Sequence, residues 1–203
     1  MMTSHETWRK NEVEGRDFTS EPGVTKVLRT GGVGGVRGGG DVTPFLYVNL
    51  HHLTKGDDED DKTPNDGKVG VASSDRSADI VSTFVYLTEV CLTEQNPVSP
   101  KVSQLIDLEE GGLGWNTGLL KKVYEVFEAN YPECLDKFVL YPVNRFVSAT
   151  LSTFLSFVNS KTRKKFIVTD SLTEVCDVLC LDEEQVREGG GLREFILKNH
   201  SVL

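Results

Sequence analysis

The sequence predicts an α/β fold with a mainly parallel, twisted sheet flanked by helices. The first observation behind this prediction is that short apolar runs typical of strands alternate with helical patterns from residue 44 to residue 180. Such alternation builds βαβ units, whose strands are parallel and whose crossovers are right-handed. The second observation is that the run 138–141 is apolar without interruption, as in a strand covered on both faces.

The expected elements follow the periodicity of the apolar residues. Short apolar runs give strands at 44–48, 102–108, 138–141 and 165–168. Apolar residues at spacings of three and four give helices at 78–95, at about 117–130 with Asn116 or Thr117 as the cap, and at 146–158. A final helix is expected to be capped by Ser171 and to carry Leu172, Val175, Cys176 and Leu179.

The folded domain is expected to span residues 43–203. Residues 1–42 are polar and contain a glycine-rich run that cannot bury enough surface to offset its backbone entropy, so we expect a disordered tail. The run is not a phosphate-binding loop, because no Gly-Lys-Ser/Thr follows it. Within the domain, residues 55–77 form an acidic insertion, which we interpret as a solvated loop because it lacks the spacing of a calcium-binding EF-hand.

The charge of the chain limits its partners. A formal net charge of −9 argues against nucleic acid, because nucleic-acid binding needs a basic face. The first eleven residues are polar and charged, so no signal peptide is expected. No apolar segment reaches the roughly 20 residues that cross a bilayer as a helix. We therefore expect a cytoplasmic protein whose membrane contact is peripheral.

The sequence predicts neither catalysis nor a metal site nor a cofactor. His51 and His52 stand together without a nucleophile motif such as G-x-S-x-G nearby. The four cysteines lack C-x-x-C spacing, which favours reduced thiols packed as small hydrophobic groups: Cys91, Cys134, Cys176 and Cys180.

The most informative segment is 131–168. Residues 146–160 form an uncharged stretch of 15 residues, and the basic cluster Lys161-Thr162-Arg163-Lys164-Lys165 follows directly. The stretch is too short to span a membrane and unusually apolar for a helix with a solvent-facing side. A buried core helix would explain this pattern, and so would a helix that covers a lipid and opens at a membrane.

Several motifs occur in a fixed order along the second half of the chain. Leu105-Ile106-Asp107-Leu108-Glu109 precedes a glycine, Tyr131-Pro132-Glu133 follows the next helix, and Lys137-Phe138-Val139-Leu140 precedes the uncharged segment and the basic cluster. In this order, over roughly residues 100–191, the sequence resembles the CRAL-TRIO lipid-binding domain, the family of phosphatidylinositol transfer, tocopherol transfer and retinaldehyde-binding proteins. The chain departs from the family in lacking the N-terminal helical lobe and in having Tyr141-Pro142-Val143 in place of Asn-Ala-Pro.

The resemblance implies a cavity that holds one lipid between the sheet and a mobile apolar gate helix. On this basis the gate helix and the cavity for the tails are expected to involve Phe146, Val147, Leu151, Phe154, Leu155, Phe157 and Val158. The residues that the family uses for an inositol lipid head group match Glu133, Thr162 and Lys165. Here Lys165 would pair with the phosphodiester, Thr162 would donate a hydrogen bond, and Glu133 would accept from inositol hydroxyls.

Two further implications concern membranes and choline lipids. Arg163 and Lys164 are expected to contact an anionic membrane, at about 1 kcal/mol for each cation near the surface. The positions at which the family places Ser and Thr for choline-lipid heads are Val102 and Gln104 here, which argues against choline-lipid exchange.

We therefore expect a protein that binds a single phospholipid, phosphatidylinositol or a phosphoinositide, and exchanges it in transient contact with cytoplasmic membranes. The alternative is a non-transferring protein-interaction scaffold of the divergent CRAL-TRIO type found in Rho-regulatory proteins, with an unidentified protein partner. A carrier of the retinoid or tocopherol type would need Glu133 and Lys165 to point away from the cavity. An apolar void would favour a ligand, and a filled interior would favour the scaffold.

Overall fold

A computed structural model describes residues 4–36, 42–54, 74–93, 100–109, 117–131, 133–143, 151–152 and 155–199. Its centre is a five-stranded sheet in the order β1-β2-β3-β4-β5. The strands are β1 (Val33–Val36), β2 (Phe45–Asn49), β3 (Val102–Asp107), β4 (Leu135–Tyr141) and β5 (Phe166–Val168). Strand β1 pairs antiparallel with β2, and the other neighbouring pairs are parallel. The predicted α/β fold with a mainly parallel sheet is confirmed.

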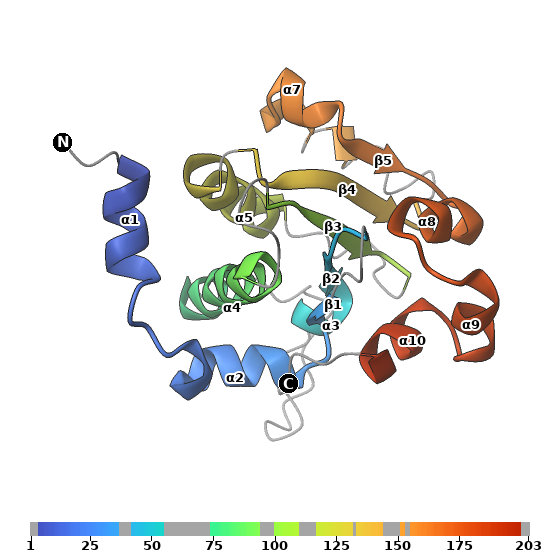
Figure 1. Cartoon of the computed structure of the whole chain (residues 1–203), viewed down its shortest axis with the longest axis horizontal. Helices are drawn as coiled ribbons and strands as arrows, with labels where there is room; N and C mark the ends of the chain where they lie inside the picture. The colour runs from blue at the N-terminus through green and yellow to red at the C-terminus, as the bar shows by residue number, and fades with distance from the viewer. Residues whose placement is uncertain are drawn as a thin grey trace, which may run out of the picture.

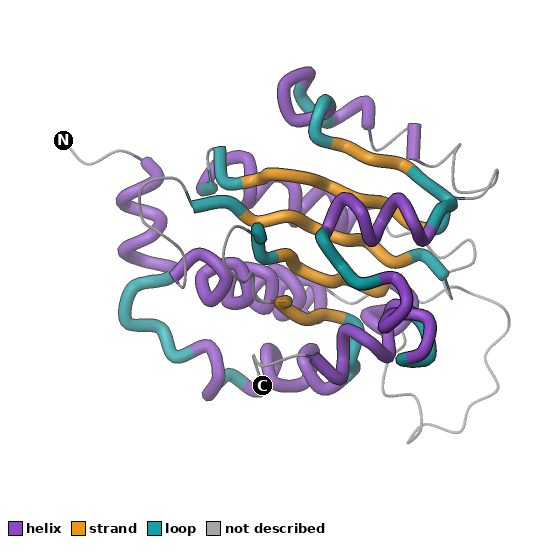
Figure 2. Tube along the Cα trace, turned by 45° about the vertical axis from the view of Figure 1, so that its right-hand side comes forward, coloured by secondary structure: helices purple, strands orange, loops and turns teal. Residues whose placement is uncertain are grey.

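Helices cover both faces of the sheet (Figures 1 and 2). The described helices before β5 are α1 (Ser4–Glu12), the 3-10 helix η1 (Phe18–Ser20), α2 (Pro22–Arg29), α3 (Leu50–Thr54), α4 (Ser74–Thr93), α5 (Thr117–Asn130) and α7 (Ser160–Arg163). Those after β5 are α8 (Leu172–Leu179), α9 (Glu183–Glu188) and α10 (Leu192–Asn199).

Alternation along the strands sends side chains into two separate cores. Ile106 and Phe138 point to the face packed by α2, α4 and α5, whereas Leu105 and Val139 point to the face packed by α8, α9 and α10. Because successive side chains of a strand point to opposite faces, uninterrupted apolar strands are what a sheet with two covered faces requires. The three middle residues of β4, Phe138, Val139 and Leu140, are all buried, as the sequence predicts.

The cap and the buried face that the sequence predicts for the helix after β5 agree with the structure. Ser171 caps α8, since its hydroxyl oxygen accepts a hydrogen bond from the backbone N–H of Glu174 at 3.3 Å. Val175, Cys176 and Leu179 of that helix are buried against the sheet. The expected helix at 78–95 begins earlier, at Ser74, so the last residues of the predicted acidic insertion are helical.

The prediction of a disordered tail over residues 1–42 is wrong for residues 4–36. Helix α2 buries Val24, Val27 and Leu28 in the core shared with α4, and β1 extends the sheet although two of its four residues are glycines. Strand β1 lacks an alternating apolar pattern, and it joins the sheet through its antiparallel backbone pairing with β2. Residues 37–41 and most of the predicted insertion 55–77 lie outside the described residues.

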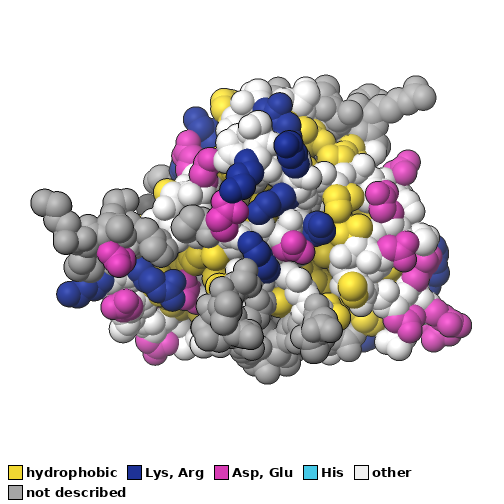
Figure 3. All heavy atoms as spheres, turned by 45° about the horizontal axis from the view of Figure 1, so that its top comes forward, with side chains coloured by type: hydrophobic (Ala, Val, Ile, Leu, Met, Phe, Trp, Pro, Cys, Tyr) yellow, Lys and Arg dark blue, Asp and Glu magenta, His cyan; other side chains and the backbone are white. Residues whose placement is uncertain are grey.

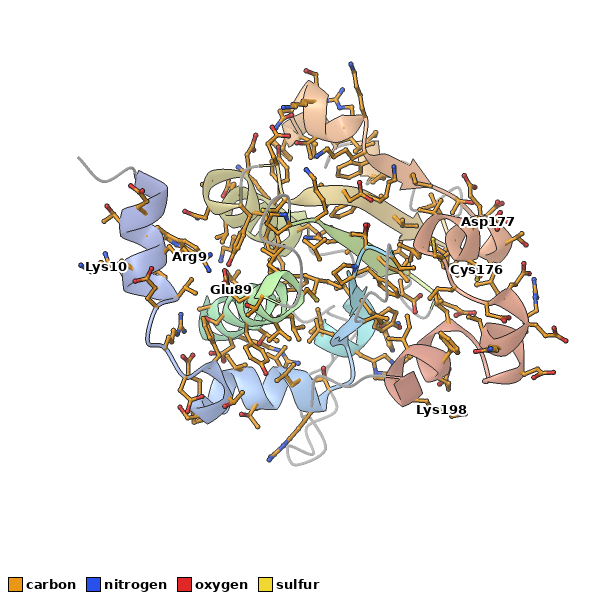
Figure 4. The ribbon with its side chains drawn as sticks, viewed as in Figure 1. Arg9, Lys10, Glu89, Cys176, Asp177 and Lys198 are labelled. Atoms are coloured by element: carbon orange, nitrogen blue, oxygen red, sulfur yellow. The ribbon has the colours of Figure 1, made fainter. Side chains whose placement is uncertain are left out.

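Helix α1 is polar and is held by a few specific contacts. Arg9 points from α1 toward Glu89 of α4 (Figure 4), and its guanidinium donates two hydrogen bonds to that carboxylate, at 2.9 and 2.6 Å. The Tyr131 hydroxyl donates a third at 2.8 Å, and the Trp8 ring lies edge-on against the Tyr131 ring at 5.7 Å between centroids. Burial and the nearby Glu89 charge both raise the pKa of Tyr131, so the hydroxyl stays a donor. Helix α1 is thereby fixed to the residue that follows α5.

A glycine substitution tests whether the N-terminal segment belongs to the folded unit. A Cβ at Gly32 would lie 2.8 Å from the backbone nitrogen of Leu53, an atom that cannot move without shifting α3. We expect Gly32→Ala to lower the free energy of unfolding by about 1–3 kcal/mol, the usual cost of overpacking. Urea denaturation followed by circular dichroism measures this change.

The matched control is Gly23→Ala in α2. Its Cβ meets the carboxylate end of the Asp79 side chain, which can rotate away, so the change should be much smaller. Equal, negligible effects of both substitutions would show that Gly32 does not lie against Leu53 as described.

Candidate functional site

The candidate ligand-binding site is a largely apolar cavity of about 270 Å³ on the sheet face that α4 and α5 cover. It is bounded by the sheet, by α4 and α5, and by the residues around α7. Its apolar lining residues are Phe84, Ile106, Leu120, Val123, Tyr124, Phe127, Tyr131, Leu135, Phe138 and Phe166. Its polar and charged lining residues are Gln104, Glu128, Glu133, Asn159, Lys161, Thr162 and Lys165.

The floor of the cavity is a row of side chains across three strands. Gln104 of β3 is paired with Phe138 of β4, which is paired with Phe166 of β5. The two phenylalanine rings stack at 4.3 Å between centroids with 15° between their planes. The floor is therefore aromatic between the central strand β3 and the edge strand β5.

Glu133 stands at the solvent-exposed rim and is held on both its backbone and its side chain. Its backbone is left-handed, with φ of 62°, which is uncommon for a residue with a side chain. Its carbonyl oxygen accepts a hydrogen bond from Lys101, and its carboxylate forms an ion pair with Lys161. The hydrogen bond from Lys161 and that cation's charge lower the pKa of Glu133, with smaller contributions from Lys165 and Lys101. Glu133 is thus an anion surrounded by three lysines.

Lys165 and Thr162 reach the same cavity from the short segment that contains α7. The Lys165 ammonium group donates a hydrogen bond to the backbone carbonyl of Leu135 at the start of β4. Asn159 caps α7, because its side-chain oxygen accepts from the backbone N–H of Thr162 at 2.8 Å. The cap fixes the turn that presents the Thr162 side chain to the cavity.

The segment before α7 is attached to α5. The Asn159 backbone N–H donates to the Tyr124 hydroxyl oxygen at 3.1 Å, and the Asn159 side-chain amide donates to Glu128 at 2.5 Å. The Arg163 guanidinium donates to the backbone carbonyls of Leu155 and Val158, at 2.6 and 3.0 Å. These bonds hold one wall of the cavity in place through polar contacts.

The structure brings together the three residues that the family resemblance assigns to the head group. Glu133, Thr162 and Lys165 all line the cavity, although 32 positions separate the first from the last. Within the described residues, the ion-pair partner of Glu133 is Lys161 and not Lys165. Their role in binding a head group stays a prediction.

The predicted gate helix is described only in part. Residues 151–152 and 155–157 are helical, whereas Phe146, Val147 and Phe154 lie outside the described residues. Leu151 and Val158 are buried in the core, and Leu155 packs against that core. Phe157 is 49% exposed, with the Lys121 ammonium group 5.0 Å from its ring centroid. None of the described gate residues lines the cavity, because their side chains pack into the core or point to solvent.

Arg163 and Lys164, the predicted membrane contacts, are both exposed. They belong to the end of the molecule where α7 lies, and Figure 3 shows Lys and Arg side chains gathered there beside hydrophobic ones. Arg163 is also engaged with two backbone carbonyls, so its charge is less available than that of Lys164.

Three residues that line or support this cavity were not predicted from the sequence to belong to the site. Lys161 lies in the recognised basic cluster but was not distinguished from its neighbours. Lys101 acts on the backbone of a residue 32 positions away, which no local pattern reveals. Gln104 did carry a signal, because it is a polar residue between the apolar residues Val102 and Ile106 on one face of a buried strand.

The described residues add two observations on other functional classes. No group of three or more His, Cys, Asp or Glu side chains in this part of the chain is arranged to hold a metal ion. Among the helices that the structure describes, none combines the length and the apolar character that crossing a membrane requires.

Comparisons with known proteins identify the family. Residues 32–185 match the CRAL/TRIO domain. Among solved structures, the crystal structure of Sfh5 shares the fold with a TM-score of 0.65 at 19% sequence identity, over 86% of this chain and 59% of that chain. This chain therefore spans about three fifths of the Sfh5 chain. No curated protein sequence matches.

The matched region begins just before β1 and ends within α9, so it contains all five strands and the whole cavity. It also contains the motifs from which the resemblance was drawn. The chain belongs to the CRAL/TRIO family of lipid-binding domains.

Proposed function

We propose that this domain binds one phospholipid with an inositol head group, phosphatidylinositol or a phosphoinositide, and exchanges it at cytoplasmic membrane surfaces without catalysis. Membership of the CRAL/TRIO family supports lipid binding in general. The observation that carries the finer proposal is that Glu133, Thr162 and Lys165 line one largely apolar cavity together with Lys161. Cations, a hydroxyl donor and a carboxylate acceptor are the groups that a phosphorylated inositol requires.

The charge distribution supports an anionic head group at the rim. Although the chain has a formal net charge of −9, residues 161–165 contribute four cations and Lys101 lies beside them. Two of the cavity-lining cations, Lys161 and Lys165, face one side of an apolar space, so a ligand with one anionic end and one hydrocarbon end fits this polarity. Such an arrangement disfavours a retinoid or tocopherol type of ligand, which has no anionic end.

The size of the cavity constrains the mechanism. A volume of about 270 Å³ lies just below the range of roughly 300–1,000 Å³ typical of small-ligand pockets, and two acyl chains need more space than a drug-sized ligand. Binding therefore requires a wall of the cavity to move. We propose that the segment before α7 swings outward, which breaks the exposed contacts of Asn159 with α5 and draws Leu155 and Val158 out of the core. Each buried CH₂ contributes about 0.8 kcal/mol, so the tails leave for another membrane and not for water.

The scaffold alternative rests on one specific observation. Leu151 and Val158 of the predicted gate segment are buried in the core, as in a helix that fills the interior. A scaffold would purify without lipid and would take up none from vesicles. Native mass spectrometry of the purified protein, before and after incubation with vesicles containing phosphatidylinositol, separates the two functions.

Substitution of Lys165 tests the head-group assignment. We expect Lys165→Ala to weaken binding of monomeric dihexanoyl phosphatidylinositol about ten- to a hundredfold, because a charge-assisted hydrogen bond to the phosphate is lost. Thr162→Val should cost about fivefold, the usual loss for one neutral hydrogen bond. Isothermal titration calorimetry measures both affinities.

The matched control is Lys164→Ala, which removes the neighbouring charge from an exposed side chain that does not line the cavity. Its affinity for the same monomeric lipid should equal that of the unaltered protein. The double variant Glu133→Ala/Lys165→Ala provides the decisive test, since undiminished phosphatidylinositol binding by it would refute the head-group assignment.

The ionisation of Glu133 gives a test that does not depend on the ligand. Lys161 favours the charged form of this carboxylate, so the pKa of Glu133 lies below its ordinary value and the ion pair persists as the pH falls through that value. We expect Lys161→Ala to raise the pKa of Glu133 back toward the ordinary range. A carbon-detected NMR titration of the Glu133 carboxylate measures the shift, with Glu183, whose pKa is lowered by Arg187, as the internal reference. An unchanged Glu133 midpoint in the variant would contradict the ion pair.

Vesicle binding tests the membrane surface. Lys164→Ala should weaken binding to vesicles containing phosphatidylserine about fivefold, the effect of roughly 1 kcal/mol for one cation near an anionic surface. High salt should abolish the difference, because exposed charges are screened. The control is Lys198→Ala in α10, which lies at the other end of the molecule (Figure 4). Equal losses for both variants would indicate non-specific attraction.

A further inference from the structure

The floor of the cavity contains a buried amide that the head-group assignment does not use. Gln104 lies within β3, lines the cavity and is only 4% exposed. Within the described part of the chain, no group forms a hydrogen bond with its side-chain carboxamide. The amide is not among the fully enclosed polar atoms that lack a partner, so it reaches the open space of the cavity.

The neighbours of Gln104 show that its position suits an apolar residue. Val102 and Ile106, the residues two positions away on the same face of β3, are buried in the core, and Leu46 is paired with Gln104 from β2. A leucine at position 104 would match these apolar neighbours, whereas the amide faces the cavity. The carboxamide, which offers two N–H donors and one oxygen acceptor, therefore points to a polar group of the ligand.

The surroundings of Gln104 select a neutral group. Near it the cavity is lined by the side chains of Ile106 and Phe138, and the cations that line the cavity come from the α7 and β5 side. A phosphate placed against Gln104 would lose its hydration without gaining a counter-ion, which is costly. An ester carbonyl is neutral and accepts a hydrogen bond from an amide N–H without that cost.

The position of Gln104 also fits the order of groups along a phospholipid. Gln104 lies two strands away from Phe166, and because neighbouring strands are about 4.8 Å apart, the separation is about 10 Å. Lys165 directly precedes Phe166 at the rim. From the rim inward the cavity thus presents cations, then aromatic rings, then one neutral amide, with apolar walls around it. A phospholipid presents phosphate, glycerol, ester carbonyls and hydrocarbon in the same direction.

We propose that the Gln104 carboxamide binds the ester carbonyl of an acyl chain, so that the domain selects ester-linked over ether-linked phospholipids. The inference rests on the proposed function, since it places the phosphate of the same lipid at the rim. Gln104 then determines specificity for the bond that joins the hydrocarbon chain to glycerol, whereas Glu133, Thr162 and Lys165 determine specificity for the head group.

The test compares two lipids that differ only in this carbonyl. Dihexanoyl phosphatidylinositol and its dihexyl ether analogue are titrated into the full chain and into Gln104→Leu, which keeps the size of the side chain and removes its polar atoms. The unaltered protein should bind the ester roughly five- to a hundredfold more tightly than the ether, the range for a buried hydrogen bond left without its partner. Gln104→Leu should bind the two lipids equally. Equal affinities in the unaltered protein, or an ester preference that survives in Gln104→Leu, would overturn the proposal.

Two further measurements distinguish a failure of the Gln104 assignment from a failure of the head-group assignment on which it rests. Repeating the comparison with the ester and ether forms of phosphatidylcholine distinguishes the two assignments: an ester preference without a preference for inositol supports Gln104 and refutes the head group. Absence of binding for every lipid overturns both. The lipid-free thermal midpoint of Gln104→Leu should equal or exceed that of the unaltered protein, because the carboxamide has no hydrogen-bond partner to lose within the described part of the chain. A marked decrease would show that Gln104 serves the fold and would refute its assignment to a ligand.

Discussion

The parallel pairing of β3 with β4 is the constraint on which the rest of the molecule depends. Both strands are buried on their two faces, so the register between them decides which side chains enter each core. With Gln104 beside Phe138, the cavity face receives one amide and an aromatic row, while Leu105 and Val139 pack under α8. A slip of one residue would exchange these two sets of side chains and destroy both cores and the cavity.

The cavity is fixed by elements that are distant in the sequence. Tyr131 lines it and also donates to Glu89, whose carboxylate is held by Arg9 of α1. On the other side, Asn159 attaches the segment before α7 to α5. The first attachment is partly buried and the second is exposed, so the two ends of the cavity differ in how firmly they are held.

Much of the fold was accessible from the sequence, for a physical reason. Strands β2 to β4 and helices α4, α5 and α8 bury apolar residues in regular patterns, and such periodicity indicates burial directly. Strand β1 and helix α1 could not be predicted in this way. The sequence of β1 is Val-Gly-Gly-Val, whose pairing is supplied by β2, and α1 is held by Arg9 and Trp8 through contacts with residues far along the chain.

The residues of the cavity also divide into those that sequence motifs indicate and those that depend on contacts between distant parts of the chain. The family resemblance singled out Glu133, Thr162 and Lys165, which folding brings to one cavity, while their role in binding a head group stays a prediction. It could not reveal that Lys101 binds the backbone of Glu133, or that Lys161 pairs with the carboxylate, since those contacts depend on the left-handed turn at residue 133. The apolar pattern of the gate segment did not distinguish side chains that line a cavity from those that pack beside it.

The left-handed turn at Glu133 has a consequence for ligand turnover. It holds a carboxylate against Lys161, so in the empty protein this cation already has a resident counter-ion. Under the proposed function, an arriving phosphate would take the place of that carboxylate, and the carboxylate would return when the phosphate leaves. Lys161 would then exchange one negative partner for another and would keep a counter-ion throughout.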